Sequence, residues 1–380
     1  MKLMFRTYII LFLFCITSCS KKSSEFIPEI ELHKVTVMNF PVDSLTNIKS
    51  WYFDVFEDKD KEWLVFQSEK PSIKFYDISK ENLEFDITFD QIGPDGVGSI
   101  NGFHVKSLDS IYLLNVAEMR IFLINNLGKV LNEFYLLKPN NKYPDGSRSS
   151  PTIISGSPAI NYNNILHFAA RPDTGPTSEE TYRSGNVEFA IDPTNGNYDL
   201  KFNYPKIYTI KNYGNFWGKI FRVKTEDNRI AYSFAADPNI YVTDYKYTEA
   251  FNAETAIFNK PIPYKDISQM RKNNLLSTMY GGIFYDKYRR LYYRIVTGGI
   301  EEFSENHVFR EIYDAKPISI IILDEEFKKI GETLLPSKAH DPLGAFVGKE
   351  GLFISNSNFE NFSLKEDTLS FTVYAPRNIK

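Results

Sequence analysis

Cysteine is nearly absent from this chain of 380 residues. Both cysteines, Cys15 and Cys19, lie at the very start, so the rest of the sequence has no thiol for a disulfide or a thiolate metal site. Long apolar runs are lacking too: the run from Tyr8 to Phe14 is much shorter than the roughly 20 residues that cross a bilayer as a helix. A domain without disulfides depends on its hydrophobic core for stability, and a chain of this length can form a large enough core.

Recognisable catalytic and metal-binding patterns are also missing. A serine nucleophile elbow is excluded at Ser155-Gly156-Ser157, because this segment lacks the flanking glycines and precedes a strand. Positive charge is not in excess, with 44 Lys and Arg against 48 Asp and Glu, which argues against general nucleic-acid binding. We therefore expect no metal, no cofactor and no nucleic-acid partner. The histidines are scattered without a close pair, so no metal-ligand spacing can be read: His33, His104, His167, His307 and His340.

The first residues have the pattern of a lipoprotein signal peptide. A short basic segment precedes the apolar run, which the lipobox Ile16-Thr17-Ser18-Cys19 closes. A lipobox cysteine takes a diacylglyceryl group, and two or three acyl chains anchor a protein stably to a membrane. We therefore expect a signal peptide over 1–18, a lipidated tether over 19–30 and an anchor at Cys19, in the cell envelope of a bacterium, at the outer membrane and facing the periplasm or cell surface. The alternative is an ordinary secreted protein in which Cys19 is incidental.

A repeat of four short strands fills the rest of the chain. Its clearest copy has turn residues between four short segments that are typical of strands, at 102–106, 110–114, 120–124 and 130–136. Looser copies keep the same order of strand and turn signals. In five copies the third strand ends on a residue whose side chain can close the next turn, namely Asp77, Asn125, Asp192, Asp244 and Asp324.

The last copy is incomplete, and this predicts how the fold closes. It has only three strands, at 343–347, 352–355 and 369–374, while the alternating segment 31–40 is left over at the start. Pairing that segment with the terminal copy would cover an exposed edge. We therefore expect an all-β fold over residues 31–380, a single six-bladed β-propeller of four-stranded antiparallel blades closed by an N-terminal strand in the last blade. The alternative is a two-sheet β-sandwich with a second domain.

The chain resembles the six-bladed β-propeller lipoproteins of Bacteroidetes-type bacteria, a family with a domain of unknown function. The resemblance implies the fold and the compartment, and it brings no catalytic residues. It rests on the lipobox and on segments of the clearest copy, namely Ile92-Gly93-Pro94-Asp95-Gly96, Phe103-His104-Val105, Ile111-Tyr112-Leu113, Arg120-Ile121-Phe122 and Asn126-Leu127-Gly128-Lys129.

The longest connections between strands are those expected on one face of such a ring. If the first strand of each blade lines the channel, connections between strands two and three and between blades share a face. Loops of this length are often binding elements, although they could simply cover the channel mouth. They are 137–150, 171–184, 259–274, 298–316 and 356–368.

Charged and aromatic residues in and beside these loops are the candidate ligand-binding residues. Arginine forms bidentate pairs with carboxylates and phosphates, and tyrosine can stack on a sugar or grip a peptide. We prefer a binding module for an envelope protein, peptide or glycan, because repeated blades supply a rigid platform. The alternative is a hydrolase, lactonase or lyase, which predicts acidic or histidine side chains that converge at the axis. The candidates are Tyr143, Asp145, Arg148, Arg171, Asp173, Tyr182 and Arg294.

Overall fold

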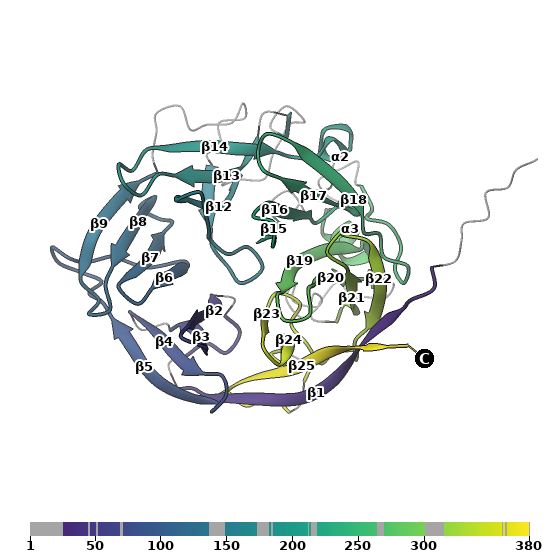
Figure 1. Ribbon diagram of the computed structural model, residues 1–380, viewed down its shortest axis with the longest axis horizontal. Coiled ribbons are helices and arrows are strands. Elements are labelled where there is room, and N and C mark those ends of the chain that lie inside the picture. Colours follow the sequence, from purple (N-terminus) through teal and green to yellow (C-terminus); the bar gives the residue numbers. More distant parts are fainter. Residues whose placement is uncertain are drawn as a thin grey trace, which may run out of the picture.

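The structure is a computed structural model, and it shows an all-β, propeller-like ring of sheets around a central axis (Figure 1). Alternating short strands and tight turns build each sheet, as the repeat predicts. The described residues are 26–44, 46–50, 52–68, 71–136, 149–172, 182–183, 185–211, 213, 219–263, 270–300, 315–358, 360–361 and 363–379.

Sheets I, II and IV are separate four-stranded antiparallel sheets, each with its first strand nearest the axis (Figure 1). Sheet I contains β2 (Phe53–Asp58), β3 (Lys61–Gln67), β4 (Ser72–Asp77) and β5 (Asn82–Thr88). Sheet II contains β6 (Phe103–Ser107), β7 (Ser110–Asn115), β8 (Arg120–Ile124) and β9 (Val130–Tyr135). Sheet IV contains β15 (Ile220–Lys224), β16 (Ile230–Phe234), β17 (Asn239–Thr243) and β18 (Thr248–Asn252).

Sheet III has five strands because its innermost strand is interrupted. Two short segments, β10 and β11, both pair with β12, so that Ser149 faces Pro172 and Ile160 faces His167. The residues between these two segments leave the sheet as a loop. The strands are β10 (Ser149–Thr152), β11 (Ile160–Tyr162), β12 (Ile165–Pro172), β13 (Asn186–Ile191) and β14 (Tyr198–Asn203).

The prediction of six separate four-stranded blades is wrong, because the remaining strands form one eight-stranded sheet, sheet V. The join is a parallel pairing of β1 with β22, at Ile30 and Gly331. Gly331 permits this approach, since a Cβ atom there would lie 2.2 Å from the Ile30 carbonyl oxygen. In sheet order the strands are β19 (Met279–Asp286), β20 (Leu291–Thr297), β21 (Ile318–Leu323), β22 (Lys329–Leu334), β1 (Ile30–Pro41), β25 (Thr368–Asn378), β24 (Gly351–Ser355) and β23 (Ala345–Gly348).

The predicted pairing of the first strand with the last strand is confirmed. β1 lies antiparallel to β25 from Ile30, opposite Asn378, to Pro41, opposite Thr368. Figure 1 shows the two strands running side by side at the edge of the ring. Phe40 fixes this register from inside, because its ring is fully buried and packs edge-on against Tyr76 and Phe371.

The turn residues at the ends of the third strands also act as predicted. Asp77 accepts hydrogen bonds from the Ser79 hydroxyl and the Lys80 amide, and Asn125 accepts from the amides of Leu127 and Lys129. Asp192, Asp244 and Asp324 accept from the amides of the turns that follow them in the same way.

Buried aromatic and branched side chains fill the spaces between neighbouring sheets. Sheets I and II share a cluster that contains Phe75 and Phe103, and sheets IV and V share one that contains Tyr280 and Tyr292. The rings of Phe75 and Phe85 stack with their centroids 4.6 Å apart. Aromatic side chains, 15% of the sequence, therefore pack both within a sheet and between neighbouring sheets.

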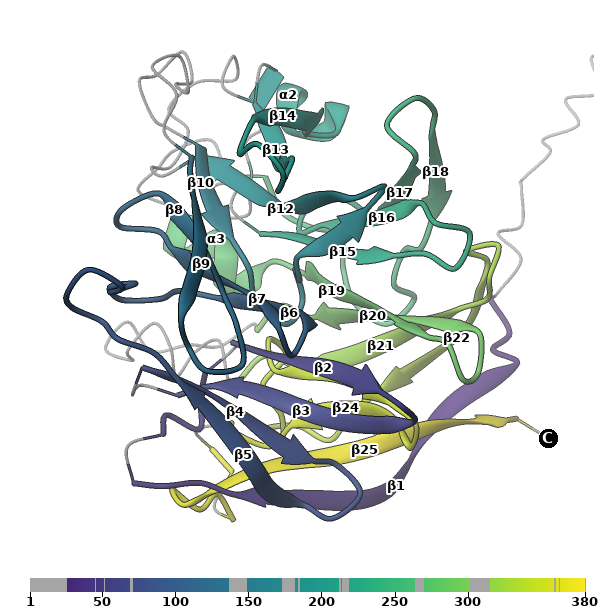
Figure 2. The same ribbon diagram turned by 60° about the vertical axis from the view of Figure 1, so that its left-hand side comes forward.

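The ring has two unlike faces, which we call the hairpin face and the loop face. The hairpin face carries tight turns, such as the β2–β3 turn at Lys59 and Asp60. Connections between second and third strands, and between sheets, begin and end on the loop face, as do the short helices α2 (Lys206–Ile210) and α3 (Met270–Leu276). Figure 2 shows α3 on the opposite side of the ring from the β2–β3 turn.

Candidate functional site

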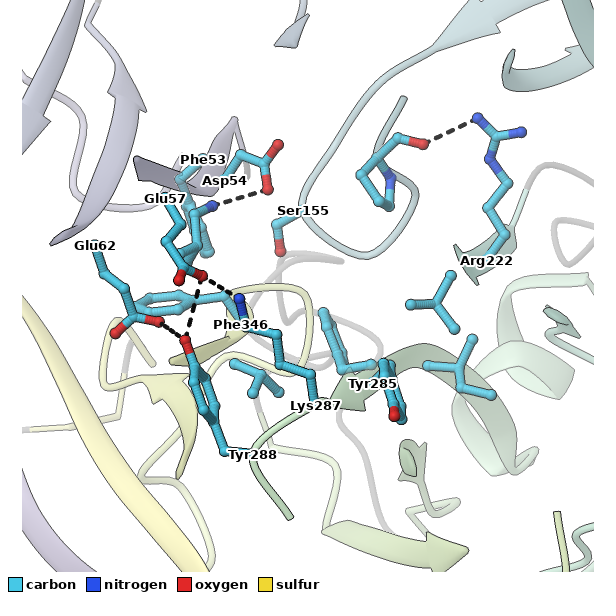
Figure 3. Close-up of a pocket in the computed structure, with 16 residues that line it drawn as sticks. Phe53, Asp54, Glu57, Glu62, Ser155, Arg222, Tyr285, Lys287, Tyr288 and Phe346 are labelled. Carbon is cyan, nitrogen blue, oxygen red and sulfur yellow. Dashed lines mark hydrogen bonds and ion pairs between the residues drawn. The ribbon is translucent and has the colours of Figure 1, made fainter. Parts of the chain in front are cut away.

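The inner strands enclose a cavity of about 290 Å³ at the axis of the ring, which we call the central cavity (Figure 3). Sheets I, III, IV and V all contribute to its wall. Phe53 and Asp54 come from β2, Arg222 from β15 and Phe346 from β23. These residues lie far apart in the sequence, and only closure of the ring brings them together.

The loop between β10 and β11 crosses the axis and forms part of the cavity wall. Its tip is a tight turn in which Ile154 and Ser157 exchange backbone hydrogen bonds. Ser155 Oγ donates to the carbonyl oxygen of Ala345 at 2.7 Å, which ties sheet III to sheet V. The turn passes close to the inner strand β19, because a Cβ atom on Gly156 would lie 3.6 Å from the Cα atom of Gly282.

Asp54 is an acidic group of the central cavity that pairs with no lysine or arginine of the described residues; Glu62 is another, and it accepts hydrogen bonds from the Tyr288 hydroxyl and the Lys349 amide. Its side chain is 35% exposed, and one carboxylate oxygen accepts the Val55 amide at 2.8 Å. Burial among the inner strands raises the pKa of Asp54 to about 6, more than the hydrogen bond from Val55 lowers it. Within the described residues, no lysine or arginine forms an ion pair with this carboxylate.

His104 on β6 lies beside Asp54, with its Nδ1 atom 4.0 Å from Oδ2 of the carboxylate. Burial, together with the charges of Lys106 and Arg222, lowers the pKa of His104 to about 4. No atom of the described residues forms a hydrogen bond with Nδ1. The two side chains therefore form an acid and a neutral imidazole whose pKa values have exchanged their usual order.

The rest of the central cavity is largely apolar. The rings of Phe53 and Phe346 meet edge to face, 5.8 Å apart, and Val223 and Ile283 complete the apolar wall (Figure 3). At the hairpin end, Lys287 forms an ion pair with Glu57, which lowers the pKa of that carboxyl. A small molecule in this space would meet apolar surface on one side and Asp54 on the other.

Arg222 connects the central cavity to a buried polar cluster. Its guanidinium pairs with Glu188 and donates to the carbonyl oxygens of Pro158, at 2.9 Å, and His167, at 2.7 Å. Both charged side chains are fully buried. Burial acts to raise the pKa of Glu188, but the Arg222 charge and hydrogen bonds from His167 and Tyr232 hold it below its usual value. Arg222 is therefore a neutralised, fixed part of the wall.

Of the predicted ligand-binding residues, the described part of the chain includes Arg171, Tyr182 and Arg294. Arg171 is exposed at the end of β12, and Tyr182 is buried against the rings of Tyr204 and Tyr208, 5.2 and 5.5 Å away. None of these lines the central cavity. Cys19, Tyr143, Asp145, Arg148 and Asp173 lie outside the described residues.

Arg294 is a structural residue at its position in β20. Its side chain is fully buried, and the guanidinium donates to Ser233 Oγ and to the carbonyl oxygens of Asp237 and Pro238. The guanidinium also lies over the Tyr280 ring, 4.1 Å from its centroid. The sequence pattern could not show this burial, because the hydrogen-bond acceptors come from the neighbouring sheet.

A metal-binding cluster and a long apolar helix are both absent from the part of the chain that the structure describes. No three histidine, cysteine, aspartate or glutamate side chains lie close enough to hold a metal ion. No helix among these residues combines the length and the apolar character that crossing a bilayer requires.

The comparisons with known proteins agree on a family and a fold. The sequence matches the model of a domain of unknown function (DUF4221) over residues 29–334. A solved DUF4221 member from Bacteroides vulgatus shares 24% sequence identity, with a TM-score of 0.81 over 93% of this chain and 99% of that chain. A solved Bacteroides fragilis protein shares 13% identity, with a TM-score of 0.55 over 92% of this chain and 96% of that one. No curated protein sequence matches the chain. The chain belongs to the DUF4221 family.

Proposed function

We propose that the protein is a binding module that holds a small amphipathic amine in the central cavity. The observation that carries the proposal is Asp54, an acid in the cavity wall that no lysine or arginine of the described residues neutralises. Glu57, in the same wall, differs because Lys287 already pairs with it. An ammonium group bound at Asp54 would supply the missing counter-charge.

The apolar wall determines the rest of the ligand. Phe53, Phe346 and Ile283 offer aromatic and branched surface, and the volume of about 290 Å³ is at the small end of ligand sites. A ligand of this kind therefore has a compact aromatic or branched body and one cationic end. The predicted contacts of Tyr143, Asp145, Arg148, Arg171 and Asp173 with a ligand at the loop face remain separate predictions.

Binding of a cation at Asp54 has a defined dependence on pH. The free carboxyl has a pKa of about 6, so it is largely protonated at pH 5 and largely ionised at pH 7. The ammonium group favours the ionised carboxylate and lowers its pKa. Affinity should therefore rise as the pH increases from 5 to 7.

Calorimetric titration of the whole protein with phenethylamine, and with 2-phenylethanol as its uncharged counterpart, tests the proposal. We expect the amine to bind at least tenfold more tightly, and Asp54→Asn to remove that difference. Asp109→Asn is the matched control, because Asp109 is an exposed acid in the β6–β7 turn. Equal binding of amine and alcohol, no binding of either, or unchanged amine binding by the Asp54→Asn variant would each contradict the proposal.

Acid–base catalysis in the same cavity is the second candidate function. The observation in its favour is the Asp54–His104 pair, because a carboxyl with a pKa of about 6 and a neutral imidazole can exchange protons with a substrate near neutral pH. A hydrolase, lactonase or lyase of this kind would lose at least a hundredfold in rate in the Asp54→Asn variant. Assays with aryl esters and γ-lactones distinguish it from a binding module, for which no turnover is expected.

We further propose that the protein is exported and anchored through a lipid at Cys19 in the cell envelope, at the outer membrane. The lipobox supports this proposal, as does the position of β1, which begins at Ile30, the last residue of the expected tether. Expression in a Bacteroides host followed by membrane fractionation and mass spectrometry tests it. Cys19→Ser should release the protein from the membrane fraction, whereas Cys15→Ser should not. A wild-type protein without acyl groups would overturn it.

A further inference from the structure

A second cavity, of about 510 Å³, lies between sheets III and IV on the hairpin face, and we call it the lateral cavity. Asn163 reaches it from the β11–β12 turn, Asp199 from β14 and Tyr245 from the turn after β17. It shares no lining residue with the central cavity. The proposed amine site therefore does not account for it.

The pairing of sheet III explains why space remains there. His167, Ala190 and Asp199 are directly opposite one another on β12, β13 and β14, so their side chains point to the same side of the sheet. Ala190 is the middle residue of this row. Because its side chain is a single methyl group, it leaves room between the larger side chains on either side.

The floor of the lateral cavity is a histidine with a fixed orientation. His167 is 3% exposed, and its Nδ1 atom bonds to the ionised carboxylate of Glu188. The carboxylate accepts a hydrogen bond from Nδ1–H, which leaves the other ring nitrogen, Nε2, facing away from Glu188. Nε2 has no hydrogen-bond partner among the described residues. The Tyr245 ring stacks on the imidazole, 5.1 Å away, and its hydroxyl also donates to Glu188.

The charges around the lateral cavity are already paired or engaged. Asp199 lies 3.4 Å from Lys201, and Asp192 accepts hydrogen bonds within its own turn, from Thr194 and Asn195. Arg222 neutralises Glu188 below the floor. An ionic ligand would therefore find no unpaired counter-charge.

The polar groups that remain suit hydroxyl groups, which donate and accept in the same place. The amides of Asn163 and Asn197 offer both donors and acceptors, and His167 Nε2 offers one further polar atom. Tyr162 and Tyr245 add aromatic surface for the carbon-bound hydrogens of a ring. We propose that the lateral cavity binds a neutral saccharide of one or two units.

Two asparagines in the β11–β12 turn provide a matched pair of variants. Asn163 and Asn164 are both exposed, with φ values of 50° and 63°, so alanine has a similar backbone penalty at each position. Only Asn163 lines the lateral cavity. Loss of binding in Asn163→Ala but not in Asn164→Ala therefore reports a contact rather than a change in the turn.

The experiment is saturation-transfer NMR and calorimetry of the whole protein with maltose, cellobiose, xylobiose and diacetylchitobiose. We expect at least one to bind with a Kd below roughly 10 mM. Asn163→Ala and Asp199→Ala should each weaken that binding at least fivefold, while Asn164→Ala leaves it unchanged. Tyr245→Phe removes only the hydroxyl that bonds to Glu188. It should also weaken saccharide binding, because the orientation of His167 would be less firmly fixed.

Three results would overturn the proposal. These are no binding of any of the four saccharides, equal affinity of the Asn163→Ala and Asn164→Ala variants, and displacement of the saccharide by phenethylamine. The last result would place the saccharide in the central cavity. Thermal unfolding of each variant confirms that it is folded before binding is measured.

Discussion

The Ser155 hydroxyl donates a hydrogen bond to the carbonyl oxygen of Ala345, 2.7 Å away, and so joins sheet III to sheet V across the ring axis. The same turn accepts the Arg222 amide at the Gly156 carbonyl, 3.2 Å away. The loop that lines the central cavity is therefore tied to sheets IV and V as well as to its own sheet.

Replacing Ser155 by alanine should lower the free energy of unfolding by about 1 kcal/mol, because the Ala345 carbonyl loses a donor in a partly buried site. Urea unfolding followed by tryptophan fluorescence measures the loss. Ser363→Ala, at an exposed turn position, is the control and should change the free energy by less than about 0.5 kcal/mol. Equal stability of the two variants would show that the bond does not secure the loop.

Replacing Glu188 by glutamine should lower the free energy of unfolding by about 3–5 kcal/mol, because the buried Arg222 charge loses its counter-charge. Tyr245→Phe removes one neutral donor to the same carboxylate and should lower it by about 1–2 kcal/mol. Thermal and urea unfolding measure both. If the glutamine variant were as stable as the phenylalanine variant, the Arg222–Glu188 pair would not be the centre of the cluster.

Replacing Phe40 by alanine should lower the free energy of unfolding by about 3–5 kcal/mol, because its fully buried ring fills the space between β1, Tyr76 and Phe371. Val35→Ala lies on the same strand but at a position that is 48% exposed, and should have an effect below about 0.5 kcal/mol. Urea unfolding compares the two variants. A small loss at Phe40 would mean that β1 contributes little to the stability of sheet V.

Acidification should destabilise the fold through His340. Burial lowers the pKa of His340 from 6.5 to about 4, so between these values the unfolded chain binds the proton and the folded chain does not. The contribution of His340 to the free energy of unfolding is fully present above pH 6.5 and falls by about 3 kcal/mol as the pH reaches 4. Asp54 changes the stability in the opposite direction on acidification, because its pKa is higher in the folded chain than in the unfolded chain.

Urea unfolding at pH 7 and pH 4.5 checks this prediction in the wild type and in His340→Gln. The substitution removes the titrating group beside the Tyr374 hydroxyl, so the variant should lose less stability on acidification than the wild type. An identical loss in both proteins would show that His340 does not contribute to the pH dependence.

The sequence predicted the strands well, because each is bounded by turn residues whose role is local. Asp77 and Asn125 end their strands by capping turns within four residues, a relationship that a short window of sequence contains. The join between β1 and β22 depends instead on the backbone of Ile30 meeting Gly331. Nothing in either segment alone indicates that contact.

The central cavity could not be predicted for the same reason. Asp54, Arg222 and Phe346 belong to three different sheets, and each sits in an ordinary strand pattern. Ser155-Gly156-Ser157 was excluded as a nucleophile elbow, and its structural role is to turn the chain at the axis. The long connections drew attention to the loop face because their length is visible in the sequence, whereas a cavity formed by short strands is not.

The pairing of β1 with β25 also sets the order in which the protein can be completed. Ile30 needs Asn378 as its neighbour, so β1 stays without this partner until residues 368–378 have been synthesised. Contacts of such long sequence separation form slowly, and an unpaired strand edge invites association with other chains. A nascent molecule therefore carries an exposed edge until β25 has been made, and the arrival of that strand ends the risk.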